Sequence, residues 1–203
     1  LRAVAKEKPV VAVMGEVATS AGYMTAVGAD YIIGRRSTIT GSIGVLMQTT
    51  EITGLLTKLG IKAETIKSAP LKAQPNPLEP MSPAARAAAE NIISDIYDMF
   101  VDLVTERRKM ARPVVLKIAD GRVYTGRQAL GNGLIDAIGD MDTARQWLAE
   151  SRDIAKSLPL RPVKIKRKPD SLLERFGDLF GKTLFSERLR LDGVISLWHP
   201  ALR

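Results

Sequence analysis

Ser20 lies in the stretch VATSAGYMTA, residues 17–26, directly after an apolar run that is typical of a buried strand. A serine hydroxyl becomes an effective nucleophile only when a neighbouring base accepts its proton. If Ser20 begins a helix, the free amides of Ala21 and Gly22 could donate to an oxyanion on the carbonyl that it attacks. Serine is also a favoured helix cap, and the residue type alone favours that role.

The bases that this sequence offers to Ser20 are its lysines and its one histidine. His199 precedes a proline four residues from the end, a position typical of a surface residue. A lysine can act as a base where burial disfavours its charged form and lowers its pKa. Lys72, in SAPLKAQPNPLEP, has alanine, leucine and proline neighbours rather than charged ones. Lys72 is therefore the preferred candidate base, although a lysine in an exposed loop is the more common occurrence.

Composition argues against several other kinds of chemistry. The chain has no cysteine and one histidine, so neither a thiolate nucleophile nor a metal site is expected. The net charge of +8 favours an anionic neighbour, nucleic acid or membrane head groups, but aromatic residues make up only 5%, too few for base stacking. The stretch TGSIG, residues 40–44, lacks the pattern of a phosphate-binding loop. We predict no metal, no cofactor and no nucleic-acid partner.

The elements around these residues alternate between strands and helices. Strands are expected at residues 9–15, 30–35, 44–48 and 61–67, the first buried on both faces of a parallel sheet. Helices are expected at residues 20–29, 51–59, 114–119 and from about 142, with a turn-rich stretch at 121–133. The alternation predicts a single layered α/β domain with a parallel sheet and flanking helices.

A long helix is expected to begin at Ser82, because Pro83 suits the first helical position. Apolar residues at helical spacing predict one continuous buried stripe on it. The stripe comprises Ile92, Ile93, Ile96, Tyr97, Phe100, Val101 and Val104.

Residues 161–203 form a separate basic and amphipathic segment, after a core of residues 1–160. This segment could face lipid head groups or pack on the core or a neighbouring subunit, and an ordinary solvated face with a packed helix explains it equally well. The chain begins at Leu1 in LRAVAKEK, which is typical of the end of a helix. We expect further protein upstream, with a targeting or anchoring segment.

Four motifs, in order across residues 8–136, resemble the signal peptide peptidase A or protease IV family of serine proteases. They are KPVVAVMGEVATSAGYMTAVGADYIIG, STITGSIGV, ETIKSAPLK and ADGRVYTGRQALGNGLID. The resemblance implies a Clp protease/crotonase-like fold and a Ser–Lys dyad. It identifies Ser20 as the nucleophile, Lys72, 52 positions downstream, as the general base, and Ser42 as the residue that hydrogen-bonds the lysine. The Ala21 amide would help to hold the oxyanion.

The sequence departs from the family pattern at two positions next to Ser20. Ala21 stands where the family has glycine, and its methyl group could narrow the site. Met24 replaces a tyrosine and could alter a wall that faces the substrate. The family's upstream glycine pair, which supplies the other oxyanion donor, would precede Leu1.

The resemblance further implies a ring-like homo-oligomer on the outer face of a bacterial cytoplasmic membrane, anchored by a segment outside this chain. Its partners would be peptide substrates, remnant signal peptides above all. In single-domain members the serine and the lysine of one site come from neighbouring protomers. The alternatives are a crotonase-like acyl-thioester enzyme, a non-catalytic scaffold of that fold, or a phage head-maturation protease of the same broad family.

Overall fold

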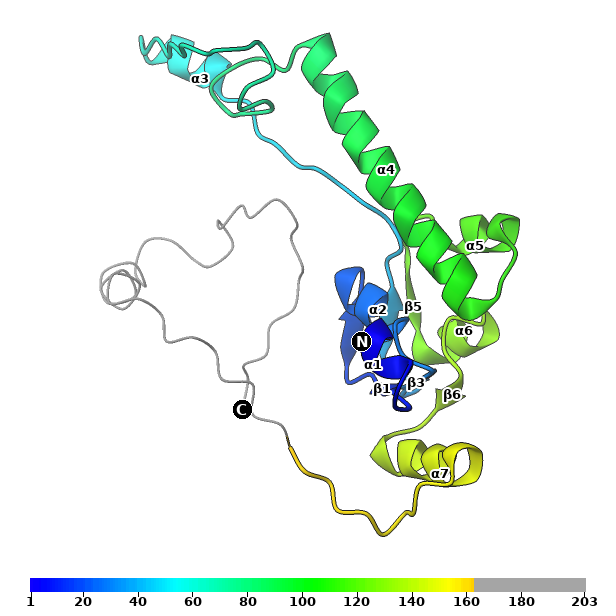
Figure 1. Ribbon diagram of the computed structural model, residues 1–203. Coiled ribbons are helices and arrows are strands. Elements are labelled where there is room, and N and C mark those ends of the chain that lie inside the picture. The colour runs from blue at the N-terminus through cyan, green and yellow to red at the C-terminus, as the bar shows by residue number, and fades with distance from the viewer. Residues whose placement is uncertain (163–203) are drawn as a thin grey trace, which may run out of the picture.

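A computed structural model describes residues 1–162 of the chain, which are the coloured residues of Figure 1. Residues 163–203 lie outside the described part. The predictions for His199 and for nearly all of the basic and amphipathic segment therefore fall outside it as well.

The strands of the described residues form two small sheets. The first has the order β1-β3-β6 and is parallel throughout: β1 (Val11–Val13), β3 (Tyr31–Gly34) and β6 (Ala137–Ile138). The second has the order β2-β4-β5: β2 (Val17–Thr19), β4 (Ile39–Gly41) and β5 (Val123–Thr125). In it β2 and β4 are parallel, whereas β4 and β5 are antiparallel. The strands predicted at residues 9–15 and 30–35 are confirmed as β1 and β3.

Seven helices connect and cover these strands in the described part of the chain. They are α1 (Arg2–Ala5), α2 (Ala21–Ala26), α3 (Thr53–Lys58), α4 (Pro83–Arg108), α5 (Arg112–Ile118), α6 (Gly126–Gly131) and α7 (Met141–Arg152). The helices predicted at 51–59, 114–119 and from 142 are confirmed as α3, α5 and α7. The helix predicted at 20–29 is the shorter α2. The predicted α/β fold, with parallel strands and flanking helices, is confirmed.

Helix α4 begins as the sequence predicts, because the Ser82 side chain accepts a hydrogen bond from the Ala85 amide and Pro83 follows it. The predicted apolar stripe is buried only in the second half of the helix, at Phe100, Val101 and Val104. Ile92 in the first half is 52% exposed, because there α4 extends beyond the core (Figure 1).

The hydrophobic core packs the second half of α4 and the helices α2, α5 and α6 against the strands. Its largest fully buried side chains are Tyr23, Phe100, Ile32, Ile33, Ile43, Leu134 and Ile135. Helix α2 therefore lies between a sheet and a long helix, and this packing fixes the strand-to-helix turn at Ser20.

Two predicted strands are wrong. Residues 44–48 and 61–67 have no regular secondary structure, and Leu46 and Ile66 are 72% and 95% exposed. A short apolar run becomes a strand only where a neighbouring strand pairs with it, and no described strand pairs with either segment. The predicted turn-rich stretch 121–133 instead forms β5 and α6, which Thr125 and Gln128 join by a capping box.

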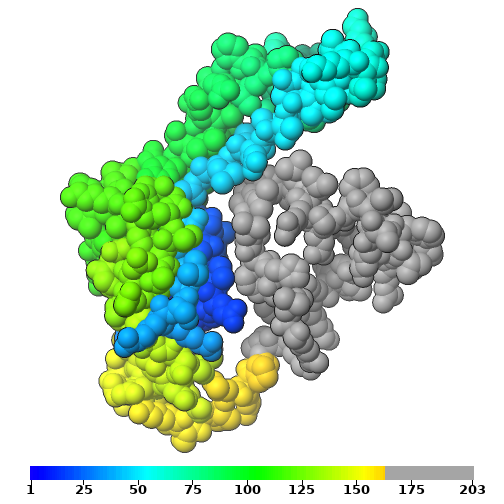
Figure 2. All heavy atoms as spheres, turned by 180° about the vertical axis from the view of Figure 1, so that it is seen from behind, coloured from blue at the N-terminus to red at the C-terminus, as the bar shows by residue number. Residues whose placement is uncertain are grey.

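Residues 50–90, which we call the arm, project from the rest of the described chain (Figure 2). The arm comprises α3, an irregular segment and the first turns of α4. Within the described residues, no helix is both long and apolar enough to span a bilayer.

Candidate catalytic site

Ser20 occupies the sharp turn between β2 and α2. Its backbone angles are φ 51° and ψ −119°, a conformation that costs free energy for any residue with a Cβ. The turn is held because the Ser20 amide donates to the Gly41 carbonyl at 2.8 Å and the Met24 amide donates to the Ser20 carbonyl at 2.9 Å. Strained strand-to-helix turns of this kind expose the nucleophilic serine of many hydrolases.

The side chain of Ser20 does not cap α2, although Ser20 stands at the N-cap position. Ser82 and Thr125, by contrast, both accept a hydrogen bond from an amide of the helix that they precede. The Ser20 hydroxyl is therefore not engaged by its helix. The first amides of α2, including that of Ala21, have no partner within the helix and can act as donors.

Ser42 lies at the same sheet edge as Ser20. In the parallel register of β2 and β4, Thr19 pairs with Gly41, so Ser20 and Ser42 each directly follow a paired residue. Ser42 also has a positive φ, 53°, and its amide donates to the Arg122 carbonyl at 2.8 Å. The structure thus brings Ser20, Ala21 and Ser42 together at the carboxyl ends of two parallel strands.

The body of α2 is anchored by Tyr23, which is fully buried and donates from its hydroxyl to the Leu134 carbonyl at 2.8 Å. Burial raises the pKa of the Tyr23 hydroxyl well above its ordinary value, so it remains a donor. Met24 packs against the hydrophobic core and is half-buried. Ala21 has helical geometry, which any residue adopts, and its carbonyl accepts from the Thr25 hydroxyl at 2.8 Å.

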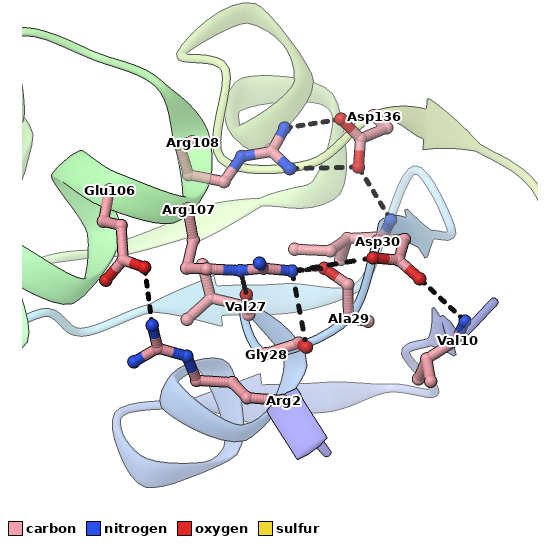
Figure 3. Close-up of polar contacts among 11 residues, drawn as sticks. Arg2, Val10, Val27, Gly28, Ala29, Asp30, Glu106, Arg107, Arg108 and Asp136 are labelled. Atoms are coloured by element: carbon pink, nitrogen blue, oxygen red, sulfur yellow. Dashed lines mark hydrogen bonds and ion pairs between the residues drawn. The ribbon is translucent and has the colours of Figure 1, made fainter. Parts of the chain in front are cut away.

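The C-terminal end of α2 is bound by Arg107 of α4 (Figure 3). Its guanidinium donates to the carbonyls of Val27 at 3.0 Å and Ala29 at 2.7 Å, with a longer contact to Gly28 at 3.5 Å. Val27 is the C-cap residue of α2, and Gly28 and Ala29 follow it, so the guanidinium lies at the C-terminus of the helix, where a cation interacts favourably with the helix dipole. Arg107 therefore stabilises the short helix that begins at Ser20.

A second arginine of α4 anchors the strand next to this helix. Arg108 forms a bidentate pair with the Asp136 carboxylate, at 3.0 and 2.7 Å. The same carboxylate accepts the Ile32 amide of β3 at 2.7 Å (Figure 3). Neither arginine is recognisable from sequence as supporting the site, because about 80 residues separate Arg107 from its partners and 28 residues separate Arg108 from Asp136.

Lys72 lies in the arm, not beside Ser20. Its side chain is exposed, and its amide donates to the Ala69 carbonyl at 3.1 Å. The segment that carries it, residues 61–80, lies near α3 at the far end of the arm, well away from α2 (Figure 1). The apolar sequence neighbours of Lys72 do not bury it within one chain. In this structure, the Ser20 and Lys72 side chains of one chain therefore do not lie together.

Within residues 1–162, no three carboxylate or histidine side chains converge closely enough to hold a metal ion. The chemistry that the described site offers is that of a serine hydroxyl, backbone amides and, from the arm, a lysine.

The sequence profile of peptidase family S49 matches residues 2–155. The chain is 36% identical over 146 residues to an Enterococcus faecium protein named as a signal peptide peptidase, with 72% of this chain and 42% of that protein covered. It is 36% identical over 149 residues to Protease 4 of Salmonella typhi, with 73% of this chain and 24% of that protein covered. The chain spans about half the length, or less, of the curated relatives that it matches. Among solved structures, a membrane-bound stomatin-specific protease is similar over 68% of this chain and 54% of its own, with a TM-score of 0.42 and 15% identity.

Proposed function

This chain belongs to peptidase family S49, the family of signal peptide peptidase A and protease 4, and on that basis we propose that it carries the nucleophile of a serine endopeptidase. The observation that supports this role most strongly is the turn at Ser20. Its backbone is strained, its hydroxyl does not cap α2, and unpartnered helix amides follow it directly.

In the proposed reaction, the Ser20 hydroxyl attacks the carbonyl carbon of the scissile peptide bond as its proton passes to the neutral amine of Lys72. The Ala21 amide donates to the oxyanion of the tetrahedral intermediate. Lys72 then gives the proton to the leaving amine, and the acyl group stays on Ser20. A water molecule then attacks the carbonyl carbon of this ester as its proton passes to Lys72. Lys72 returns the proton to the Ser20 oxygen as the bond from that oxygen to the acyl group breaks, which releases the carboxylic acid product. Ser42 orients Lys72 by a hydrogen bond.

We propose that Lys72 reaches Ser20 from a neighbouring copy of the chain. The position of the arm supports this arrangement, because it holds Lys72 exposed and away from the Ser20 turn of its own chain. Sites shared between successive copies would make a ring-like homo-oligomer a condition of activity.

The substrate class follows from the relatives and not from the geometry. One relative is named as a signal peptide peptidase, and we propose remnant signal peptides as the substrates of this protein too. The proposed location is the outer face of a bacterial cytoplasmic membrane.

A serine-directed fluorophosphonate probe, applied to the full-length protein, tests this function. We expect covalent labelling of Ser20, and we expect Ser20→Ala and Lys72→Ala each to lower peptidase activity by on the order of 10³-fold or more. The matched control is Lys62→Ala, which removes another exposed lysine of the arm and should leave activity unchanged. Binding of coenzyme A without labelling of Ser20 would instead support a crotonase-like enzyme.

A further inference from the structure

One carboxylate closes the loop that carries Lys72. Glu79 accepts hydrogen bonds at the same oxygen, Oε2, from Lys67 Nζ at 2.5 Å and from Gln74 Nε2 at 2.6 Å. Lys67 precedes Lys72 by five residues, and Gln74 follows it by two. Glu79 therefore ties down the chain on both sides of the proposed base.

The contact between Lys67 and Glu79 is more protected than an ordinary surface ion pair. The Lys67 side chain is 12% exposed and that of Glu79 is 27% exposed. Exposed pairs contribute little because water and salt screen them, whereas a partly buried pair that also forms hydrogen bonds is stronger. Lys67 also holds the pKa of the Glu79 carboxyl below its ordinary value, so the carboxylate stays charged at neutral pH.

Further local hydrogen bonds give the loop a defined shape. The Asn76 side chain donates to the Ala73 carbonyl at 3.0 Å and accepts the Leu78 amide at 2.9 Å. The loop is also tied to the residue before α3, since the Ile52 amide donates to the Pro77 carbonyl at 3.0 Å. Lys67 is thus engaged within the loop, whereas the Lys72 side chain is exposed.

We propose that Glu79 is a positioning residue of the peptidase, which with Lys67 and Gln74 holds residues 67–79 in the shape that presents Lys72 to the serine of another copy. This inference rests on the proposed function of Lys72. A general base must lie within hydrogen-bond reach of the hydroxyl that it deprotonates. A misplacement of about 1 Å can lower a rate by about 100-fold, so a base on a projecting arm needs a fixed loop.

Glu79→Gln tests the inference in the full-length protein, because it removes the charge and nearly preserves the shape. We expect kcat and the rate of fluorophosphonate labelling to fall by about 10- to 100-fold, with KM changed by less than about threefold. The matched control is Glu64→Gln, an exposed glutamate of the same arm that forms no ion pair among residues 1–162.

Rescue separates positioning from a general structural defect. A double variant with Lys67→Glu and Glu79→Lys exchanges the two charges and restores the ion pair, and the Gln74 amide can turn to present its oxygen to the new lysine. Its kcat should therefore recover most of the difference between Glu79→Gln and the wild type. Absence of rescue or a wild-type kcat for Glu79→Gln would each overturn the positioning role. If Lys72→Ala itself remains fully active, the proposed base is wrong; if only Glu79→Gln is silent, the base stands and this inference fails.

Discussion

The backbone at Ser20 depends on Gly41, whose carbonyl accepts the Ser20 amide. Gly41 has a φ of 80°, and a Cβ there would lie 2.7 Å from Cδ2 of the buried Tyr124 ring. We expect Gly41→Ala to lower the free energy of unfolding by about 1–3 kcal/mol, because both the conformation and the space oppose a side chain. It should also slow fluorophosphonate labelling of Ser20. Gly54→Ala is the control, since a Cβ there meets nothing within 4 Å, and chemical denaturation measures both variants. Equal stabilities would contradict the argument.

Tyr23 gives a pH-dependent prediction. In the unfolded chain its hydroxyl ionises near pH 10, whereas in the folded protein burial raises its pKa above that value. Its contribution to stability is therefore fully present below pH 10 and falls as pH rises beyond it, by up to about 1.4 kcal/mol per pH unit. Tyr23→Phe should lose this dependence. At neutral pH it should cost about 1–2 kcal/mol, because the Leu134 carbonyl loses its donor.

Unfolding curves of the wild type and Tyr23→Phe at several pH values between 8 and about 11 measure the difference, since all other groups titrate alike in both. Parallel pH dependences would show that the Tyr23 hydroxyl is not protected by the fold.

Among single residues, the sequence identified the candidates at the strand ends but not their supports. Ser20 stands out because it follows an apolar run and begins a stretch of small residues, whereas Ser42 is identified only by the family resemblance, and the structure places both at one sheet edge. Whether the Ser20 side chain caps its helix could not be decided from residue type, because serine suits both roles. The backbone angles decide it, and they depend on a hydrogen bond to Gly41 across the sheet.

Helix α2 has only six residues, so its two ends largely determine how firmly Ser20 is held. We expect Arg107→Met to lower the free energy of unfolding by about 1–3 kcal/mol, because the carbonyls of Val27 and Ala29 lose a charged donor. Labelling of Ser20 should slow with it. Arg107→Lys keeps the charge but cannot donate to both carbonyls in the same fork, so it should recover only part of the loss.

The control for Arg107 is Lys117→Met, which removes an exposed cation from the neighbouring α5. If Arg107→Met and Lys117→Met unfold at the same denaturant concentration and label at the same rate, Arg107 does not stabilise the serine helix.

At the level of elements, the sequence predicts best where the signal is local. The start of α4 follows from Ser82 and Pro83, and β1 and β3 follow from their apolar runs. The prediction fails at residues 44–48 and 61–67, where an apolar run has no strand beside it. It fails again along the first half of α4, where Ile92 belongs to the predicted buried stripe but lies outside the core. In each failure, long-range packing within the described chain decides the outcome.

For the whole molecule, the arm lies away from the Ser20 turn of its own chain (Figure 1). This arrangement predicts that the active site forms between neighbouring copies of the chain. A chain with Ser20→Ala keeps Lys72, and a chain with Lys72→Ala keeps Ser20, so each pure preparation lacks one half of every site. If the halves come from neighbouring copies, a mixture contains some sites with both residues intact. We expect an equimolar mixture of the two full-length variants, unfolded and refolded together, to recover about one quarter of the wild-type activity per site, as random placement around a ring implies.

The control is wild-type protein mixed and refolded with a double variant that carries both Ser20→Ala and Lys72→Ala. Its activity shows how far activity falls when wild-type chains are placed at random among inactive ones. Size-exclusion chromatography establishes that the variants assemble like the wild type. If they do so and the mixture of single variants stays inactive, Ser20 and Lys72 of one site belong to the same chain. The arm would then have to fold back onto its own core by bending where residues 44–52, which have no regular secondary structure, leave that core.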